Sequence, residues 1–374
     1  MWWPGRRSGQ DVKWLQEVRR AGTVADRVAA MTLLLQESAV ANLRSLDELL
    51  RWVGKSSGAR AVAGQAIDAL REIFIAALLP DRKLKFFEEQ PIAAVPDNKE
   101  GMRRLLYFYV EDQIKRRYAA FVGMLEEASR ENLEFLKDKT LKAIATLLAA
   151  KPEQEAHLLA ALVNKLGDPS RKLASKAGYL LRGVLEEHPA MKVVMAREVE
   201  RFLFRPGLQE RARYYGVIFL NQMPLSHNAS EGNTLSYALA QKLVDIYFTL
   251  FKLILEGKLG HGSELVDARM LGALLAGVRR AFPYVHGDAS EGVASHHADA
   301  LFRVLHTAPL GVAVQALALL FQLLSARSAV SDRFYRCCTP RICPANTVLP
   351  KPACPHVSSL QAAKHSSHGM GVAV

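Results

Sequence analysis

The chain has 374 residues, half of them hydrophobic, and the absence of cysteine before position 337 excludes a secreted body stapled by disulfides. Aromatic residues make up only 8% while leucine and alanine are plentiful, which favours helices over strands. The formal net charge of +12 favours a polyanionic partner, either a nucleic acid or an acidic membrane surface.

The first 80 residues show the apolar periodicity of four helices. Trp14, Leu15 and Val18 are expected on one face of the first helix, over 11–21. Thr23 is a suitable N-cap for the second, which runs to about residue 37. Its expected inward positions are Val24, Val28, Met31 and Leu35. The third helix starts at Ser38 or Asn42 and ends near Gly54. The fourth stops at Pro80.

The charged segment 81–100 contains two prolines and is the first long loop. Beyond it, helices are expected within 101–150, over 152–166, in three amphipathic segments within 176–224, and up to 255. Further helices are expected over 263–282, 290–306 and 309–324, with a second loop at 226–234. The runs LLYFYV and YYGVIFL are strand-like locally, but each lies inside a longer 3.6-residue pattern and is assigned to helix.

An internal repeat suggests the architecture. Five windows align on a terminal proline, and the residue five positions before it is always apolar. The windows are 67–80, 139–152, 176–189, 211–224 and 270–283, and the aligned residues are Ile75, Leu147, Val184, Phe219 and Val278. Successive starts differ by 72, 37, 35 and 59 residues, close to one or two units of a HEAT-like or armadillo-like array. We therefore expect an all-α solenoid of stacked helix pairs with a disordered C-terminal tail.

Such a solenoid offers a long surface for extended partners and no single deep active site. The sequence contains no phosphate-cradling glycine loop. The cysteines at 337, 338, 343 and 354 lack a paired C-x-x-C spacing, and His296, His297 and His306 lack the i, i+4 spacing of a shared metal. We expect no enzymatic activity, no cofactor, no metal and no small-molecule substrate.

Two clusters of basic residues are the candidates for phosphate contact. They are Arg201, Arg205, Arg211 and Arg213 in one cluster, and Lys115, Arg116 and Arg117 in the other. The alternative is that these charges are ordinary exposed residues, or pair with Glu198, Glu200 and Glu210. The uncharged stretch Ala308–Ala326 is interpreted as a packed helix rather than a membrane span, because it contains proline, glycine and glutamine.

Several long segments, in order, carry a family resemblance. They are DRVAAMTLLLQES (26–38), LLPDRKLKFFEEQP (78–91), EVERFLFRP and ERARYYGVIFLNQMPLSH within 190–227, RMLGALLAGVRRAFPYV (269–285) and SDRFYR (331–336). Together they resemble the CCAAT-binding factor domain family of nucleolar-complex proteins over roughly residues 10–336. We expect N-terminal helical repeats over 10–90, a family-type solenoid over 91–330 and a divergent tail over 331–374. The likeness stops after Arg336, so the chain is expected to be a truncated product or alternative gene model.

The resemblance implies a nuclear, mainly nucleolar scaffold that helps assemble precursors of the large (60S) ribosomal subunit. Pre-ribosomal RNA and assembly proteins, including a related nucleolar-complex protein, are the implied partners. Two alternatives stay open, a transcription cofactor at CCAAT elements and a solenoid that binds only proteins. No basic region runs into leucine heptads, so the bZIP mode of DNA binding is not expected.

Overall fold

The computed structural model describes residues 9–54, 60–225, 233–257, 264–285, 298–306, 308–325, 334 and 336. Within these residues the chain forms helices joined by turns, with no strand, which confirms the predicted all-α class. The chain divides into two compact units, Met1–Val285 and His286–Val374. Residues 226–232 of the predicted loop, the cysteines, His296 and His297, and nearly all of the tail lie outside the described residues. The last two residues of that predicted loop, 233 and 234, belong instead to the first turn of a helix.

The first unit contains α1 (Gly9–Ala21), α2 (Val24–Glu37), α3 (Leu43–Val53), α4 (Arg60–Ile73), η1 (Phe74–Leu78), η2 (Phe87–Glu89), η3 (Ile92–Ala94), α5 (Lys99–Ala128), α6 (Glu134–Ala150), α7 (Glu155–Asn164), η4 (Lys165–Gly167), α8 (Arg171–Glu187), η5 (Pro189–Met191), α9 (Lys192–Leu203), α10 (Glu210–Gln222), α11 (Asn233–Leu255), α12 (Glu264–Ala281) and η6 (Phe282–Tyr284). The second unit contains helical residues 298–306 and α14 (Leu310–Ser325).

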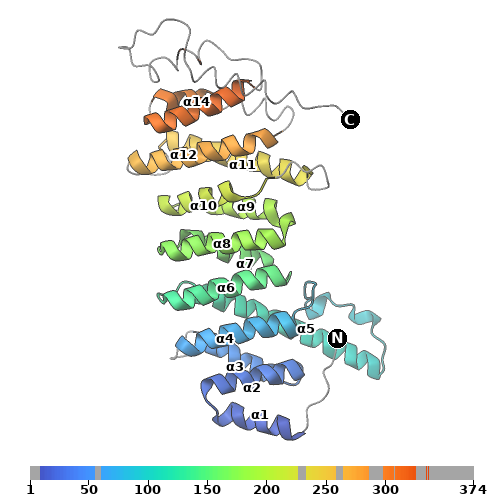
Figure 1. Cartoon of the computed structure of the whole chain (residues 1–374). Helices are drawn as coiled ribbons and strands as arrows, with labels where there is room; N and C mark the ends of the chain where they lie inside the picture. The colour runs from blue at the N-terminus through green and yellow to red at the C-terminus, as the bar shows by residue number, and fades with distance from the viewer. Residues whose placement is uncertain are drawn as a thin grey trace, which may run out of the picture. The chain divides into compact units, whose positions relative to one another are not determined.

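Helices that alternate along the chain pack into two layers. The first layer is formed by α4, α6, α8, α10 and α12, and the second by α5, α7, α9 and α11. Each helix contacts the adjacent members of its own layer. Contacts between the layers are made by the pairs α5–α6, α6–α7, α7–α8, α9–α10 and α11–α12, and Figure 1 shows the helices as successive rungs. The unit is therefore a two-layer α-solenoid. At its N-terminal end, α2 and α3 pack on α4, and α1 packs on α2.

The five proline-terminated windows fall on the five helices of the first layer. Leu147, Val184, Phe219 and Val278, four of the five aligned residues, are buried. A proline cannot continue a helix, so it ends each helix at the same phase of the apolar stripe. The sequence repeat therefore corresponds to the repeated helices of the first layer.

The fifth aligned residue, Ile75, is only partly buried, and Phe74 is fully buried in its place. Here η1 is a π-helical turn, in which the Leu79 amide donates to the Phe74 carbonyl at 2.9 Å. This wider turn shifts the phase by one residue relative to an α-helix. Phe74 consequently packs on Tyr118 and Phe121 of α5, with ring centroids 5.0 and 5.4 Å apart.

In the N-terminal helices, the predicted helix boundaries are confirmed, but the predicted burial of two side chains is wrong. Thr23 caps α2 in a reciprocal capping box with Asp26, and α3 begins after Asn42. Trp14 and Val24, however, are exposed. The first helix packs mainly on α2, which covers the side of Leu15 and leaves Trp14 in solvent.

Ion pairs connect successive rungs as well. The Lys139 ammonium of α6 lies 2.5 Å from Asp68 of α4, and Lys176 of α8 pairs with Asp138 of α6. In the second layer, Lys242 of α11 lies 2.7 Å from Glu200 of α9. These pairs are partly exposed, so each contributes at most about 1 kcal/mol and mainly fixes the register between rungs.

In the second unit, the Phe321 ring of α14 lies 6.0 Å from the Phe334 ring. Val312, Ala316, Leu319 and Leu323 of α14 are buried, as an apolar helix inside a protein requires. Across the described part of the chain, none of the helices combines the length and apolar character needed to cross a bilayer.

Candidate nucleic-acid interface

The corner between α7 and α8 is built around Asp168, whose side chain is almost fully buried. Its carboxylate lies 3.3 Å from Lys165 and 3.4 Å from Lys137 of α6, and it accepts the Ser170 amide at 3.0 Å. Burial pushes the pKa of Asp168 upward, but the Ser170 amide and the Lys165 ammonium outweigh burial and hold this pKa below its ordinary value. The corner is therefore a rigid, charged anchor between rungs.

The next corner, between α9 and α10, attaches to this anchor through two of the predicted arginines. Arg205 donates to the Asn164 side chain at 3.0 Å. Arg211 donates to the Asp168 carbonyl at 3.3 Å and also to the Pro169 carbonyl. Both arginines are exposed, and so are Arg171 and Lys172 at the start of α8. We call these four residues the basic edge.

Arg201 lies in the last turn of α9, four residues before Arg205. Its side chain is 75% exposed and lies 2.8 Å from the Glu198 carboxylate. Pairing with Glu198 was the alternative to phosphate contact that the sequence left open. Glu198 is 15% exposed, but the Arg201 side chain lies mostly in solvent, so this i, i+3 pair contributes little energy, about 0.5 kcal/mol or less.

Arg213 does not belong to this surface. It is 6% exposed, on the side of α10 that faces the interior. Burial lowers the pKa of its guanidinium, against the raising effect of Glu210. Residues two apart on a helix point to nearly opposite sides, so the exposure of Arg211 already indicated the burial of Arg213.

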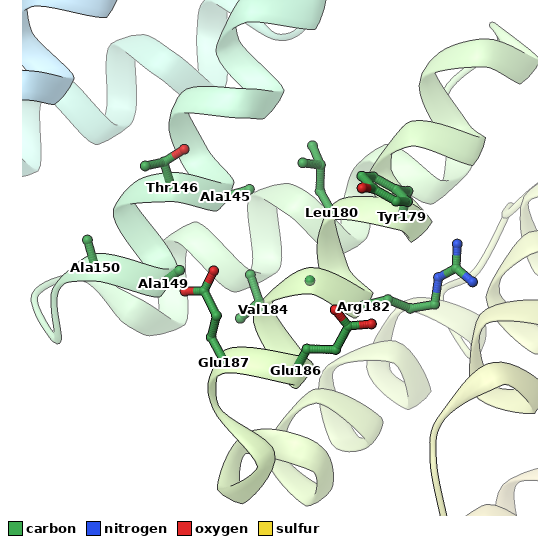
Figure 2. A pocket seen from close by; sticks show the side chains of 11 residues that line it. Ala145, Thr146, Ala149, Ala150, Tyr179, Leu180, Arg182, Val184, Glu186 and Glu187 are labelled. Atoms are coloured by element: carbon green, nitrogen blue, oxygen red, sulfur yellow. The ribbon is translucent and has the colours of Figure 1, made fainter.

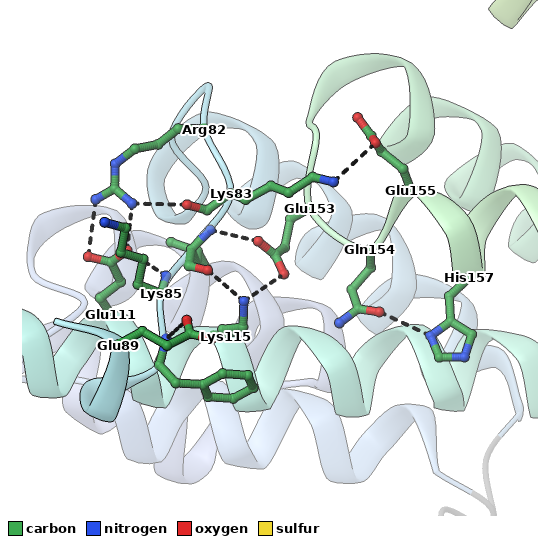
Figure 3. Close-up of polar contacts among 12 residues, drawn as sticks. Arg82, Lys83, Lys85, Glu89, Glu111, Lys115, Glu153, Gln154, Glu155 and His157 are labelled. Carbon is green, nitrogen blue, oxygen red and sulfur yellow. Dashed lines mark hydrogen bonds and ion pairs between the residues drawn. The ribbon is translucent and has the colours of Figure 1, made fainter. Parts of the chain in front are cut away.

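In the second predicted cluster, Lys115 holds the segment that connects α4 to α5. Its ammonium donates to the Leu84 carbonyl at 2.5 Å and lies 3.6 Å from the Glu153 carboxylate. Glu153 is buried and accepts the Leu84 amide at 2.7 Å (Figure 3). With 14% of its side chain exposed, Lys115 is a structural residue and not a surface charge.

The same segment is fixed at a second point by Glu111 of α5. Arg82 binds this carboxylate through both of its terminal nitrogens, at 2.6 and 3.1 Å, and the Lys85 amide donates to it at 2.9 Å (Figure 3). Burial raises the pKa of Glu111, but the Arg82 and Lys85 hydrogen bonds outweigh it and give a net lowering. The connecting segment is thus firmly attached to α5.

Arg117 and Arg116 differ in exposure. Arg117 makes a two-pronged contact with Asp47 of α3, at 2.7 and 3.1 Å, with 19% of its side chain exposed. Arg116 is exposed, lies 2.8 Å from Asp112 and sits over the Phe86 ring at 5.5 Å. Of the second cluster, only Arg116 remains accessible to a nucleic acid.

A groove between α6 and α8, with a volume of about 400 Å³, was not anticipated from the sequence. It is lined by small residues, including Ala145, Ala149 and Gly183. Tyr179, Glu186 and Glu187 also line it, and Figure 2 shows their side chains. The lining contains no histidine or cysteine. Among the described residues, no group of three or more histidine, cysteine or acidic side chains could hold a metal ion.

Comparison with known proteins gives relatives but no family model that matches the chain. Human CCAAT/enhancer-binding protein zeta is 40% identical over 333 residues, covering 87% of this chain and 30% of the relative. Ribosome biogenesis protein NOC1 of Chaetomium thermophilum is 32% identical over 372 residues, with 87% and 34% covered. Nucleolar complex protein 1 of Drosophila melanogaster is 31% identical over 345 residues, with 88% and 28% covered.

The chain spans about a third of the length of the curated relatives it matches. Their names support the CCAAT-binding factor resemblance carried by the sequence segments. Two of the relatives are named for ribosome biogenesis or for a nucleolar complex.

Proposed function

We propose that the chain is a non-enzymatic scaffold of the CCAAT-binding factor domain family that assists assembly of large (60S) ribosomal subunit precursors in the nucleolus. Its partners would be pre-ribosomal RNA and ribosome-assembly proteins, including a related nucleolar-complex protein. The observation that carries the proposal is the exposure of Arg201, Arg205 and Arg211 around the α9–α10 corner of a solenoid, one of whose relatives is named for ribosome biogenesis.

The RNA contact is proposed at the basic edge together with Arg201. Arg205 and Arg211 are held in place by carbonyl and amide oxygens of the α7–α8 corner, so they carry no neutralising carboxylate in those contacts. Their charge therefore stays available to phosphate oxygens. Contacts of this kind are independent of sequence and weaken as salt is raised.

The test neutralises Arg201 and Arg205 together in the full chain, as Arg201→Gln/Arg205→Gln. Crosslinking to pre-ribosomal RNA is measured in cells, and binding of a twelve-nucleotide uridine RNA is measured between 50 and 200 mM salt. We expect the slope of log affinity against log salt to become shallower by about 1.4, since each lost contact to a single strand removes about 0.7.

The matched control is Lys83→Gln/Lys252→Gln, which removes the same charge at two exposed positions away from the edge. The control should keep the salt slope of the wild type. Unchanged crosslinking and an unchanged slope in the arginine variant would remove the RNA contact from the proposal.

A second candidate, a transcription cofactor at CCAAT elements, is favoured by the name of the human relative alone. It requires a promoter-bound chromatin signal that survives RNase, whereas the scaffold requires RNase-sensitive co-sedimentation with large-subunit precursors. A solenoid that binds only proteins would show neither RNase sensitivity nor nucleic-acid crosslinks.

A further inference from the structure

The N-terminal half of α5 carries an apolar stripe that no other part of the described chain covers. None of residues 102–109 is buried, although most of them are apolar. Met102, Leu106 and Tyr109 are 72%, 48% and 50% exposed. They are spaced i, i+4 and i+7, which places them on one face of the helix. We call these three residues the α5 stripe.

The C-terminal half of the same helix is packed in the ordinary way. From Val110 onward its apolar positions are covered, including Ile114, Tyr118, Phe121 and Leu125. In Figure 1, α5 runs past its neighbours in the solenoid, and the part that extends beyond them carries the stripe. Large exposed apolar side chains that gather on one helix face mark a binding surface more often than single scattered ones do.

The exposed half is nevertheless held rigidly. Asn98 caps the helix by accepting the Gly101 amide at 2.8 Å. On the other side, Glu111 and Asp112 accept the Lys85 and Phe87 amides at 2.9 and 3.3 Å. A partner would therefore meet a helix that is already ordered, which reduces the entropy cost of docking.

The charges around the stripe are mostly positive. Lys99, Arg103 and Arg104 are exposed, and Glu100 is the only acidic residue between positions 99 and 110. Glu100 lies 4.0 Å from Arg103, with both side chains more than half exposed. A partner with acidic residues beside its apolar face would complement this surface.

We propose that the α5 stripe docks an amphipathic helix of a protein partner whose apolar face is flanked by acidic residues. The i, i+4, i+7 spacing matches the ridges along which two helices pack. Met102 and Leu106, two of the three stripe residues, lack the flat aromatic face on which bases stack, which favours a protein over RNA here. A second copy would bring Arg103 and Arg104 of both chains together, and a net charge of +12 opposes that pairing.

The inference adds a protein-binding site to the scaffold proposed above and does not depend on the RNA contact at the basic edge. The experiment uses the full chain and two fluorescent designed helices of 21 residues. One has a leucine stripe flanked by glutamates, and the other has every glutamate replaced by lysine. We expect the acidic helix to bind with a Kd in the tens of micromolar range, at least tenfold more tightly than the basic helix.

The variant Met102→Gln/Leu106→Gln/Tyr109→Gln should weaken binding of the acidic helix at least tenfold. Glutamine keeps helix propensity high and the three positions are exposed, so the fold should be preserved, as circular dichroism would confirm. The control Tyr179→Gln/Val194→Gln alters two large apolar residues that are also more than half exposed, on α8 and α9, and it should bind as the wild type does. Exchange of Arg103 and Arg104 for glutamate should reverse the preference to the basic helix.

The proposal is overturned if the acidic helix fails to bind the wild type, or if the glutamine variant binds it equally well. It is also overturned if the stripe variant loses uridine RNA binding while it retains the helix. A wild type that sediments as a dimer, together with a monomeric variant, would assign the stripe to self-association instead. The Arg201→Gln/Arg205→Gln variant should bind the acidic helix normally, so failure of the RNA proposal is separable from failure of this one.

Discussion

The clusters at 115–117 and 201–211 are similar in sequence and differ in what their charges do. Around 115–117, two of three basic side chains are used inside the molecule, where they hold a connecting segment and a neighbouring helix. Around 201–211, three arginines remain exposed: Arg205 and Arg211 donate to uncharged oxygens, and Arg201 pairs with Glu198 at the edge of α9. A run of basic residues is therefore a candidate surface only where most of its side chains stay exposed and are not held in buried ion pairs.

The largest expected effect is at Lys115. Lys115→Met leaves Glu153 buried without its counter-charge, so we expect a loss of about 3 kcal/mol in the free energy of unfolding, measured by urea denaturation. Lys83→Met is the control, since Lys83 pairs with Glu155 in solvent and should cost less than about 0.5 kcal/mol. Equal costs for the two variants would mean that the 115–117 cluster is a surface cluster after all.

Asp168 comes next, because it anchors the corner that supports the basic edge. Asp168→Asn leaves Lys165 without its carboxylate, so we expect a loss of about 2 kcal/mol near neutral pH. The folded pKa of Asp168 is lowered, so its contribution is present above the unfolded pKa and is lost as pH falls through the folded value. Wild-type stability should therefore decline below about pH 5, with a shallower decline in the variant. If the stability of the wild type and of the variant declined equally with falling pH, Asp168 would not be the group that anchors this corner.

A smaller effect is expected at Arg117. Arg117→Ala removes a two-pronged contact with Asp47, which is itself 45% exposed, so the loss should be about 1 kcal/mol. Asp47→Ala should cost a similar amount, and the double variant should cost clearly less than the sum, as the thermal or urea midpoints would show. Strict additivity would indicate that the pair contributes nothing to the α3–α5 contact.

The smallest effect on stability is expected for Arg201→Gln/Arg205→Gln. These side chains are exposed and weakly paired, so the free energy of unfolding should change by less than about 0.5 kcal/mol while RNA affinity falls. This variant sharpens the contrast with Lys115, where stability changes and RNA affinity per folded molecule does not. A large loss of stability would place these arginines among the structural ones.

The layers of the fold were predictable because their signals are local. Proline and an apolar residue five positions earlier recur at one phase, and that phase is set within a single helix. Only η1 departs from this repeat, because its π-helical turn contains one more residue than an α-helical turn, and no feature of the sequence indicates that extra residue.

The roles of the basic residues were harder to predict. Arg117 finds its carboxylate 70 residues away and Leu84 finds Glu153 69 residues away, so no window of sequence contains both partners. The α6–α8 groove depends in the same way on small residues from two helices that only the stacking brings together. Arg213 is the exception, because residues two apart on one helix point to nearly opposite sides, so Arg211 and Arg213 could not both be exposed on the same face.

The stacking of the first unit has a mechanical consequence. Because each rung rests only on its immediate neighbours, tilting one rung by a few degrees disturbs two interfaces and leaves the others intact. Small tilts at many interfaces add up to a large change of curvature at little cost in any one place. A unit of this kind can therefore bend to follow the contour of an extended partner.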